Sequence, residues 1–306
     1  TDLEQAVAKA DAVFIAVGTP SRRGDGHADL TYVFDAVRKV ADALDGYTVI
    51  VTKSTVPVGT GTEVFKIIKD LRPDADFDVA SNPEFLREGN AIEDFMRPDR
   101  IIVGTDSERA KEVIRELYRA LFLNETPVLF TSRQTAELIK YTANAFLATK
   151  ITFINEIANL CEQVDADVQD VARGIGLDGR IGSKFLHAGP GYGGSCLPKD
   201  VKAIINFSTK AGINPTLLTA VEKTNKQQIN SIIKLIKQNI GKIHGRKIAV
   251  LGIAFKPETD DIRDSVSVEL VNRLIKLGAK ITIHDPKAIE NAKKIFSDKV
   301  TYQKSV

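Results

Sequence analysis

The chain has 306 residues, of which 43% are hydrophobic and 27% charged, and its formal net charge is +2 at pH 7. This composition is typical of a soluble globular protein with room for about two domains. The small charge gives no reason to expect a nucleic acid or an anionic membrane as partner. No apolar run approaches the roughly 20 residues that a membrane-spanning helix needs. Two cysteines form no disulfide framework, which indicates a reducing, cytoplasmic environment. No metal site is expected, because the four histidines do not stand at ligand spacing with either cysteine.

The first part of the chain alternates short apolar runs with amphipathic stretches. Runs without in-and-out alternation are typical of strands buried on both faces, and helical crossovers between them predict a parallel sheet. We therefore expect part of a doubly wound α/β domain over residues 1–131. The expected strands lie within 12–18, 47–52, 78–81, 100–104 and 127–130, and the expected helices within 31–45, 60–71 and 106–121.

A long helical pattern free of Gly and Pro follows at about 132–164, and Thr131 with Gln134 would form a capping box at its start. Helical spacing continues over 165–226, interrupted by a glycine-rich loop. Residues 214–241 predict a second long helix whose apolar positions exceed what one small neighbour would cover, so we expect this helix to pair in a dimer. Residues 132–241 are expected to form a central helical domain.

From residue 246 the pattern returns to α/β. A strand at 246–255, a helix near 266–277 and a strand within 279–286 predict one further βαβ unit, which makes 242–306 a second, partial α/β domain. The chain opens without an initiator methionine and closes just after what reads as a strand–helix pair, so both ends are expected to be cut.

The segment "GPGYGGSCLPKD", residues 189–200, is a phosphate-binding loop, a plain turn or the seat of a nucleophile. It matches G-x-G-x-x-G, but that pattern indicates dinucleotide binding only between a strand and a helix, and no buried strand precedes it. Pro198 suits the first turn of a helix. Cys196 would then precede a helix N-terminus with Lys199 within one turn, and both features favour the thiolate.

The alternative for Cys196 is a buried, inert cysteine beside a tight turn, which is the commoner situation for a lone cysteine. Cys161 continues the apolar face of Ile154 and Ile157, and for it we accept the inert reading.

Two pairs of polar residues repeat the i,i+4 spacing of one helix face. Lys140 and Asn144 lie among apolar residues, so the lysine needs an anionic partner such as a substrate oxygen, or else extends to water. Glu84 and Glu88 follow a predicted strand end, where open α/β sheets place ligands, and either could act as a base or be solvated.

Two further residues have both a functional and a structural interpretation. Thr55 in "TKSTVPVGT" would bond a substrate or cap the helix near Pro57. Arg180 in "GLDGRIGSKFLHAG" would meet a phosphate or carboxylate, or project into water.

Six segments in order resemble the signature motifs of the UDP-glucose/GDP-mannose 6-dehydrogenase family. They are "KSTVPVGT", "SNPEFLREGNAIEDF", "ELIKYTANAFLATK", "GRIGSKFL", "GPGYGGSCLPKD" and "GIAFKPETDDIRDS". The likeness covers essentially the whole chain, and "DRIIVG" and "GRIGSKFLHAGPGYGGSC" are most similar to the branch that acts on UDP-glucose. The resemblance implies a partial Rossmann-like NAD domain, a helical middle domain and a partial Rossmann-like sugar-nucleotide domain.

The resemblance also implies a chemistry, in which a sugar-nucleotide C6 alcohol is oxidised to a carboxylate by two NAD molecules. It makes Cys196 the nucleophile that forms a thiohemiacetal and then a thioester, with Glu84 directing water and Lys140 and Asn144 stabilising an oxyanion. Asp200 would support proton transfer and Thr55 would position the reacting group or a water. The implied cofactor residues are Val17, Gly18, Thr19, Pro20, Thr55, Glu88 and Arg263. The implied substrate residues are Phe85, Leu86, Glu88, Lys140, Asn144, Arg180, Tyr192, Gly193 and Lys256, with Arg180 reaching a neighbouring subunit.

The family's N-terminal G-x-G-x-x-G is absent from the chain, so we expect residues 1–306 alone to aggregate or to bind NAD immeasurably weakly. A sister enzyme acting on GDP-mannose or a UDP-N-acetylhexosamine is one alternative, and a non-catalytic sugar-nucleotide-binding protein is another. The resemblance further implies a cytoplasmic homodimer that serves polysaccharide biosynthesis.

Overall fold

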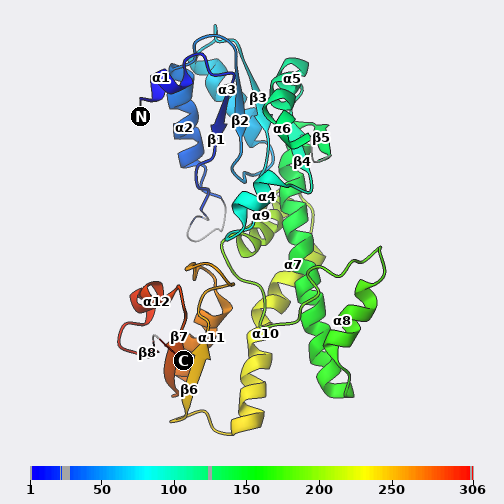
Figure 1. The fold of residues 1–306 in the computed structure, drawn as a ribbon, viewed down its shortest axis with the longest axis vertical. Helices are drawn as coiled ribbons and strands as arrows, with labels where there is room; N and C mark the ends of the chain where they lie inside the picture. Colours follow the sequence, from blue (N-terminus) through cyan, green and yellow to red (C-terminus); the bar gives the residue numbers. More distant parts are fainter. Residues whose placement is uncertain (1, 21, 23–27, 123–125, 304, 306) are drawn as a thin grey trace. The chain divides into compact units, whose positions relative to one another are not determined.

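The computed structural model describes residues 2–20, 22, 28–122, 126–303 and 305. The chain divides into two compact units, residues 1–143 and 144–306, and each is described here by itself (Figure 1).

The first unit is built on a five-stranded sheet with the order β1-β2-β3-β4-β5. Its strands are β1 (Ala12–Ile15), β2 (Thr48–Thr52), β3 (Phe77–Ser81), β4 (Ile101–Gly104) and β5 (Val128–Thr131). The fold class expected from the sequence is confirmed, but the expectation of a wholly parallel sheet is wrong at one place. β4 pairs with β3 antiparallel, through Ser81 and Gly104, because only the short helix α4 (Ala91–Met96) lies between the two strands instead of a full crossover helix.

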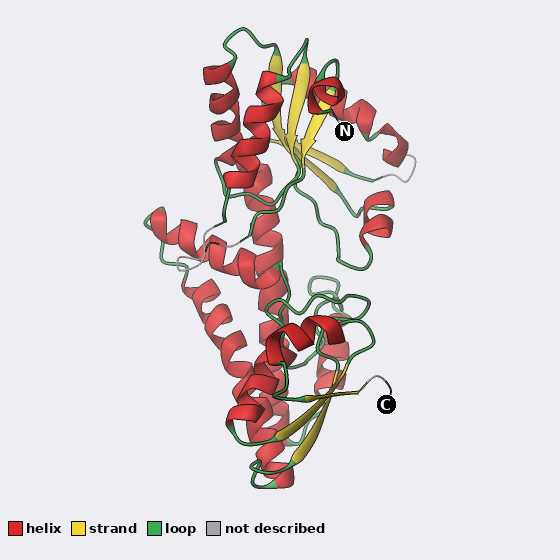
Figure 2. Ribbon diagram, turned by 90° about the vertical axis from the view of Figure 1, so that its left-hand side faces the viewer, coloured by secondary structure: helices red, strands yellow, loops and turns green. Residues whose placement is uncertain are grey.

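Helices cover both faces of this sheet (Figure 2). Every residue of β2 is buried, and alternate side chains point to opposite faces. Ile50 packs with α2 (Thr31–Asp42) and α3 (Thr60–Leu71), while Val49 and Val51 pack with α5 (Glu108–Leu117). The short helices α1 (Leu3–Val7) and α6 (Arg119–Phe122) complete the unit.

The long helix α7 (Arg133–Val164) begins in the first unit and continues into the second. The capping box expected at Thr131 is wrong, because Thr131 is the last residue of β5. Ser132 takes the capping role instead, and its Oγ accepts a hydrogen bond from the Thr135 backbone N–H at 3.2 Å.

The second unit contains α8 (Val168–Gly176), α9 (Leu197–Lys210) and α10 (Thr216–Ile240). Residues 177–196 contain no helix, so the expected helical spacing over 165–226 is interrupted for longer than the glycine-rich loop alone. On α10, Ile233 and Ile236 pack against the core of the smaller sheet, so part of the apolar face expected to pair in a dimer is covered within the chain.

That smaller sheet is parallel, with the order β6-β7-β8. It consists of β6 (Lys247–Leu251), β7 (Lys280–His284) and β8 (Thr301–Gln303), connected by α11 (Val266–Lys276) and α12 (Ile289–Phe296). The sequence predicted one βαβ unit here, and β8 adds a second. Asp285, directly after β7, accepts hydrogen bonds from the backbone N–H groups of Ile253, Ala254, Lys287 and Ala288. Burial opposes ionisation of Asp285, but these four bonds together lower the pKa of its carboxyl.

Candidate active site

The loop after β1 and the turn after β2 are bonded to each other in the first unit. The Ser54 hydroxyl donates to the Val17 carbonyl at 2.6 Å, and the Thr19 hydroxyl donates to the Thr55 carbonyl at 2.9 Å. Both segments follow the carboxyl ends of neighbouring parallel strands. The residues expected at the cofactor, Val17 to Pro20 and Thr55, are therefore brought together where an open α/β sheet binds its ligand.

Glu84 and Lys140 form an ion pair in the same unit. The Lys140 side chain is almost fully buried, and its Nζ lies 3.3 Å from Glu84 Oε1. The other carboxylate oxygen of Glu84 accepts the Leu86 backbone N–H at 2.5 Å, and Lys140 Nζ lies 5.2 Å from the centre of the Phe85 ring. The buried lysine thus has a protein carboxylate as its partner and the Phe85 ring as a neighbour.

Lys53 belongs to this cluster and was not singled out from the sequence. Its Nζ donates to Asn82 Oδ1 at 3.0 Å and to the Tyr118 hydroxyl at 3.1 Å. Burial is the main reason that the pKa of Lys53 falls to about 8; the charge of Lys140 lowers it further and that of Glu84 opposes the fall. A lysine directly after a buried strand is the signal that could have identified it.

In the second unit, Cys196 is the N-cap residue of α9 and its side chain is exposed. The Asp200 backbone N–H donates to the Cys196 carbonyl at 2.9 Å, so the two residues span the first turn of the helix. The alternative of a buried cysteine is therefore wrong for Cys196, and its reactivity stays a prediction. Cys161 is buried and free, as expected for an inert side chain.

Asp200 is 1% exposed and has two charged or polar partners. Its Oδ2 accepts from the Asn144 side-chain amide at 2.6 Å, and its Oδ1 pairs with Lys199 Nζ at 2.7 Å. The sequence indicated Lys199 as a charge that favours the Cys196 thiolate. In the structure the ammonium of Lys199 is paired with Asp200, and its effect on Cys196 stays a prediction.

The glycines of the 189–194 loop permit close packing of the chain on itself. A Cβ at Gly191 would lie 2.9 Å from Asn225 Oδ1, one at Gly194 would lie 2.6 Å from the Phe255 ring, and one at Gly193 would collide with the Asp264 carbonyl. The Gly194 backbone N–H also donates to the Arg263 carbonyl at 3.1 Å. These contacts give Gly191, Gly193 and Gly194 a packing role, whereas Gly189 has open space around its Cβ position.

The remaining substrate and cofactor candidates differ in exposure. The Tyr192 side chain is buried, and burial raises the pKa of its hydroxyl. The Arg180 side chain is 90% exposed and is held by Asp178, with Nη2 at 2.6 Å from Oδ2. Arg263 is paired with Asp261 in the same way, at 2.6 Å. Glu88 is exposed and Lys256 is half-buried.

Family models match almost the whole chain. Residues 1–122 match the NAD binding domain of the UDP-glucose/GDP-mannose dehydrogenase family, 134–227 match its central domain and 249–306 match its UDP binding domain. A UDP-glucose 6-dehydrogenase of Rhizobium meliloti (strain 1021) is 60% identical over 96% of this chain and 68% of its own length. The chain belongs to the UDP-glucose/GDP-mannose dehydrogenase family.

Solved structures of relatives agree with this assignment. A UDP-glucose dehydrogenase from Pyrobaculum islandicum is 42% identical, with a TM-score of 0.94, over 99% of this chain and 70% of that one. A UDP-D-ManNAc dehydrogenase from Pyrococcus horikoshii is 27% identical, with a TM-score of 0.82, over 94% of this chain and 68% of that one. The chain therefore spans about two thirds of the length of these relatives. Its cofactor is NAD, because residues 1–122 match the family's NAD binding domain. None of its described helices is both long and apolar enough to cross a membrane.

Proposed function

We propose that the protein oxidises UDP-glucose to UDP-glucuronate with NAD. The observation that carries the proposal is the arrangement at the start of α9, where an exposed cysteine begins the same helical turn as a buried carboxylate bonded to Asn144. An accessible thiol beside a fixed carboxylate suits covalent capture of an aldehyde. The 60% identical relative is itself a UDP-glucose 6-dehydrogenase, which favours this substrate.

The residues present fit NAD in the first unit. The Val17–Pro20 loop and Thr55 lie together after two parallel strands, and a Cβ at Gly18 would meet nothing within 4 Å, so a flat ring has access to the backbone there. We assign Glu88 to the same region and Arg263 as a further contact residue. NAD supplies the hydride acceptor for each of the two oxidation stages.

The first half of the reaction converts the C6 alcohol to an aldehyde by loss of a proton and a hydride. The Cys196 thiolate then adds to the aldehyde carbon, and the carbonyl electron pair moves to oxygen to give a thiohemiacetal. Lys140 and Asn144, one turn apart on α7, stabilise the negative charge that develops on that oxygen. Thr55 orients the reacting group or a water.

The second half releases the acid. Loss of a second hydride from the thiohemiacetal gives a thioester on Cys196. Water directed by Glu84 adds to the thioester carbonyl, and the C–S bond breaks to give the carboxylate and the free thiol. Asp200, held by Asn144 and Lys199, supports the associated proton transfers. The Glu84–Lys140 ion pair supports these roles, because it holds the two side chains 3.3 Å apart.

We assign substrate contacts to the following residues. Phe85 and Leu86 adjoin Glu84, while Tyr192, Gly193 and Lys256 belong to the glycine-rich loop and the segment after β6. Arg180 is the candidate for a contact to a neighbouring subunit, since its guanidinium is exposed. The domain limits proposed are 1–131 for NAD, 132–241 for the central helices and 242–306 for the UDP moiety.

The test is a substrate panel with the intact protein. NADH formation is followed with UDP-glucose, UDP-N-acetylmannosamine and GDP-mannose, and UDP-glucose is expected to give two NADH per sugar and the highest kcat/KM. Preference for an N-acetylhexosamine would assign the protein to the sister activity, and absence of NADH with every sugar nucleotide would make it a binding protein.

We further propose a cytoplasmic homodimer formed through the central helices, acting in polysaccharide biosynthesis. Four of the exposed large apolar side chains of α7 are Phe146 (63%), Phe153 (51%), Leu160 (55%) and Val164 (61%). Their spacing places them along one face of the helix. Leu217 on α10 is also exposed. Two free cysteines and no disulfide agree with a reducing compartment.

A further inference from the structure

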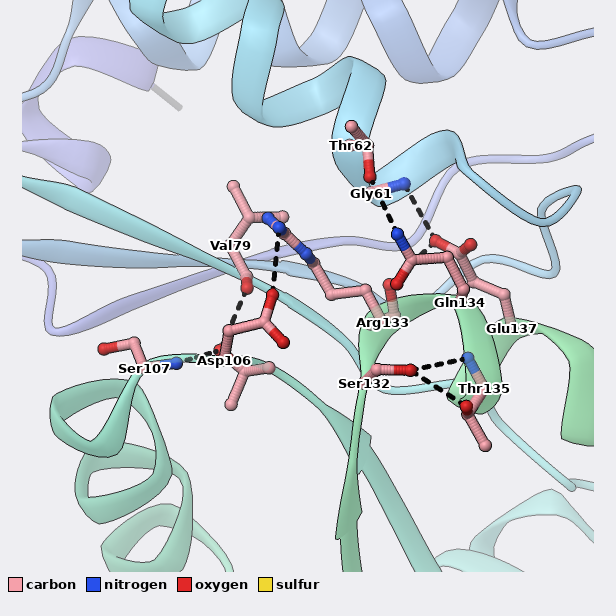
Figure 3. Close-up of polar contacts among 12 residues, drawn as sticks. Gly61, Thr62, Val79, Asp106, Ser107, Ser132, Arg133, Gln134, Thr135 and Glu137 are labelled. Carbon is pink, nitrogen blue, oxygen red and sulfur yellow. Dashed lines mark hydrogen bonds and ion pairs between the residues drawn. The ribbon is translucent and has the colours of Figure 1, made fainter.

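A buried carboxylate outside the proposed chemistry lies at the start of α7. Glu137 is 3% exposed, and both of its oxygens accept hydrogen bonds. Oε2 accepts from the Gly59 backbone N–H at 2.6 Å, and Oε1 accepts from the Gly61 backbone N–H at 2.8 Å and from the Ser81 hydroxyl at 2.9 Å. Figure 3 shows the Glu137 carboxylate directed at Gly61. One side chain thus binds the first turn of α3 and the end of β3.

The first turn of α3 is shaped for this contact. A Cβ at Gly61 would lie 3.0 Å from Glu137 Oε1 and 2.9 Å from Ser81 Oγ, so a larger residue would displace the carboxylate. Gly59 has a φ of +98°, a conformation that glycine adopts without strain. The two glycines allow two N–H donors of one turn to reach the same carboxylate.

A residue of the proposed chemistry lies in or next to each element that Glu137 joins. Thr55 lies in the turn that leads into α3, Glu84 follows Ser81 along the chain, and Lys140 lies one turn after Glu137 on α7. The Glu84–Lys140 ion pair connects the segment that follows β3 to α7, three residues beyond Ser81 and Glu137 respectively.

We propose that Glu137 is a positioning residue that fixes the Thr55 turn and the Glu84–Lys140 pair relative to each other. The inference rests on the proposed function for the roles of those three residues. All three groups around Glu137 are donors, so the carboxylate acts only as an acceptor, as an ionised glutamate does. Burial raises the pKa of Glu137, and the hydrogen bonds from Gly61, Gly59 and Ser81 oppose that rise.

The decisive variant is Glu137→Gln, which keeps the volume of the side chain. Its amide oxygen can still accept from Gly61 and Ser81, but its NH₂ group then faces the Gly59 N–H, and two donors repel each other. At a temperature well below the unfolding midpoint of every variant, we expect kcat to fall at least tenfold while KM for UDP-glucose stays within twofold. Hydrogen–deuterium exchange over residues 57–64 should quicken in the same variant.

Gln134→Ala is the matched control. Gln134 lies one turn before Glu137 and also connects α7 to α3, with its Nε2 donating to Thr62 Oγ1 at 3.3 Å, but this contact is exposed (Figure 3). Its removal should leave kcat and the exchange of 57–64 unchanged.

A Glu137→Gln protein with a lower Tm but normal kcat would overturn the proposal, because the carboxylate would then serve stability alone. If Glu137→Gln does not fold, Ser81→Ala can be used, because it removes one of the three donors and keeps the carboxylate. A normal kcat in Ser81→Ala would also overturn the proposal. A severalfold fall in its kcat would support the proposal. If the unaltered protein reduces no NAD with any sugar nucleotide, the proposed function fails. The positioning role is tested separately: unchanged hydrogen–deuterium exchange of residues 57–64 in Glu137→Gln would refute it.

Discussion

The Asn144 side-chain amide donates a 2.6 Å hydrogen bond to Asp200, and both side chains are buried. The bond joins α7 to the first turn of α9, the turn that begins at Cys196. The orientation of the asparagine amide is therefore set by a carboxylate that lies 56 residues away in the sequence. An oxyanion donor held in this way needs little reorganisation during the reaction.

Asp200→Asn should impair both activity and stability. The substitution places an NH₂ group near the Asn144 amide and leaves the Lys199 ammonium without its carboxylate. We expect kcat to fall at least tenfold and the free energy of unfolding to fall by about 1–3 kcal/mol. Steady-state NADH formation and urea unfolding measure the two effects.

The control for this variant is Asp170→Asn, which breaks the exposed ion pair with Arg173 on α8. It should cost less than about 0.5 kcal/mol, because exposed pairs contribute little. Equal losses of unfolding free energy in both variants would show that burial does not strengthen the contacts of Asp200.

Lys53 should make stability depend on pH. Its pKa is about 8 in the folded chain against an ordinary value of 10.5, so between these two pH values the unfolded chain binds more protons. Stability must then rise as pH increases through this window. Relative to Lys53→Met, the unaltered protein should gain about 1 kcal/mol between pH 7 and pH 9. The free energies of unfolding of the two proteins are measured with urea across that range. If both change with pH in the same way, the lowered pKa of Lys53 is refuted.

The exposed apolar face of α7 should mediate dimerisation. Phe153→Glu places a charge in the middle of the row that includes Phe146 and Leu160. We expect this variant to sediment as a monomer at micromolar concentration, where the unaltered protein is a dimer. Leu71→Glu, at an exposed apolar position at the end of α3, should leave the dimer intact. A dimer that survives Phe153→Glu would assign the interface to another surface.

Much of the fold could be predicted because local patterns determine it. The apolar runs located the five strands of the first sheet, and the helix over 60–71 was predicted with its observed limits. The direction of β4 could not be predicted, because it depends on how residues 82–100 turn rather than on the composition of β4. The third strand of the smaller sheet, β8, was missed because its short, polar sequence carries no apolar pattern.

The candidate site shows the same limit. Lys140, Asn144 and Glu84 were singled out by spacing. The pairing of Lys140 with Glu84 and of Asn144 with Asp200 was not predicted, since contacts between residues far apart in sequence leave no local pattern. Glu137 was not singled out from the sequence. Its spacing to residues 140 and 144 places all three on one face of a helix, and the structure shows that the three side chains are buried.

Cys196→Ser should abolish complete turnover while sugar-nucleotide binding persists, because a serine hydroxyl is a far weaker nucleophile than a thiolate at neutral pH. Cys161→Ala is the control, since that cysteine is buried and has no proposed role in the reaction. It should keep its kcat. A serine variant that forms the acid at the normal rate would exclude a thioester.

The most direct test of the account is the mass of the Glu84→Gln protein quenched during turnover with UDP-glucose and NAD. In the proposed mechanism Glu84 directs water at the thioester, so its loss should slow hydrolysis more than the two oxidations. The account predicts an accumulated acyl adduct, located on the peptide that contains Cys196. Free enzyme alone, with every step slowed equally, would contradict it.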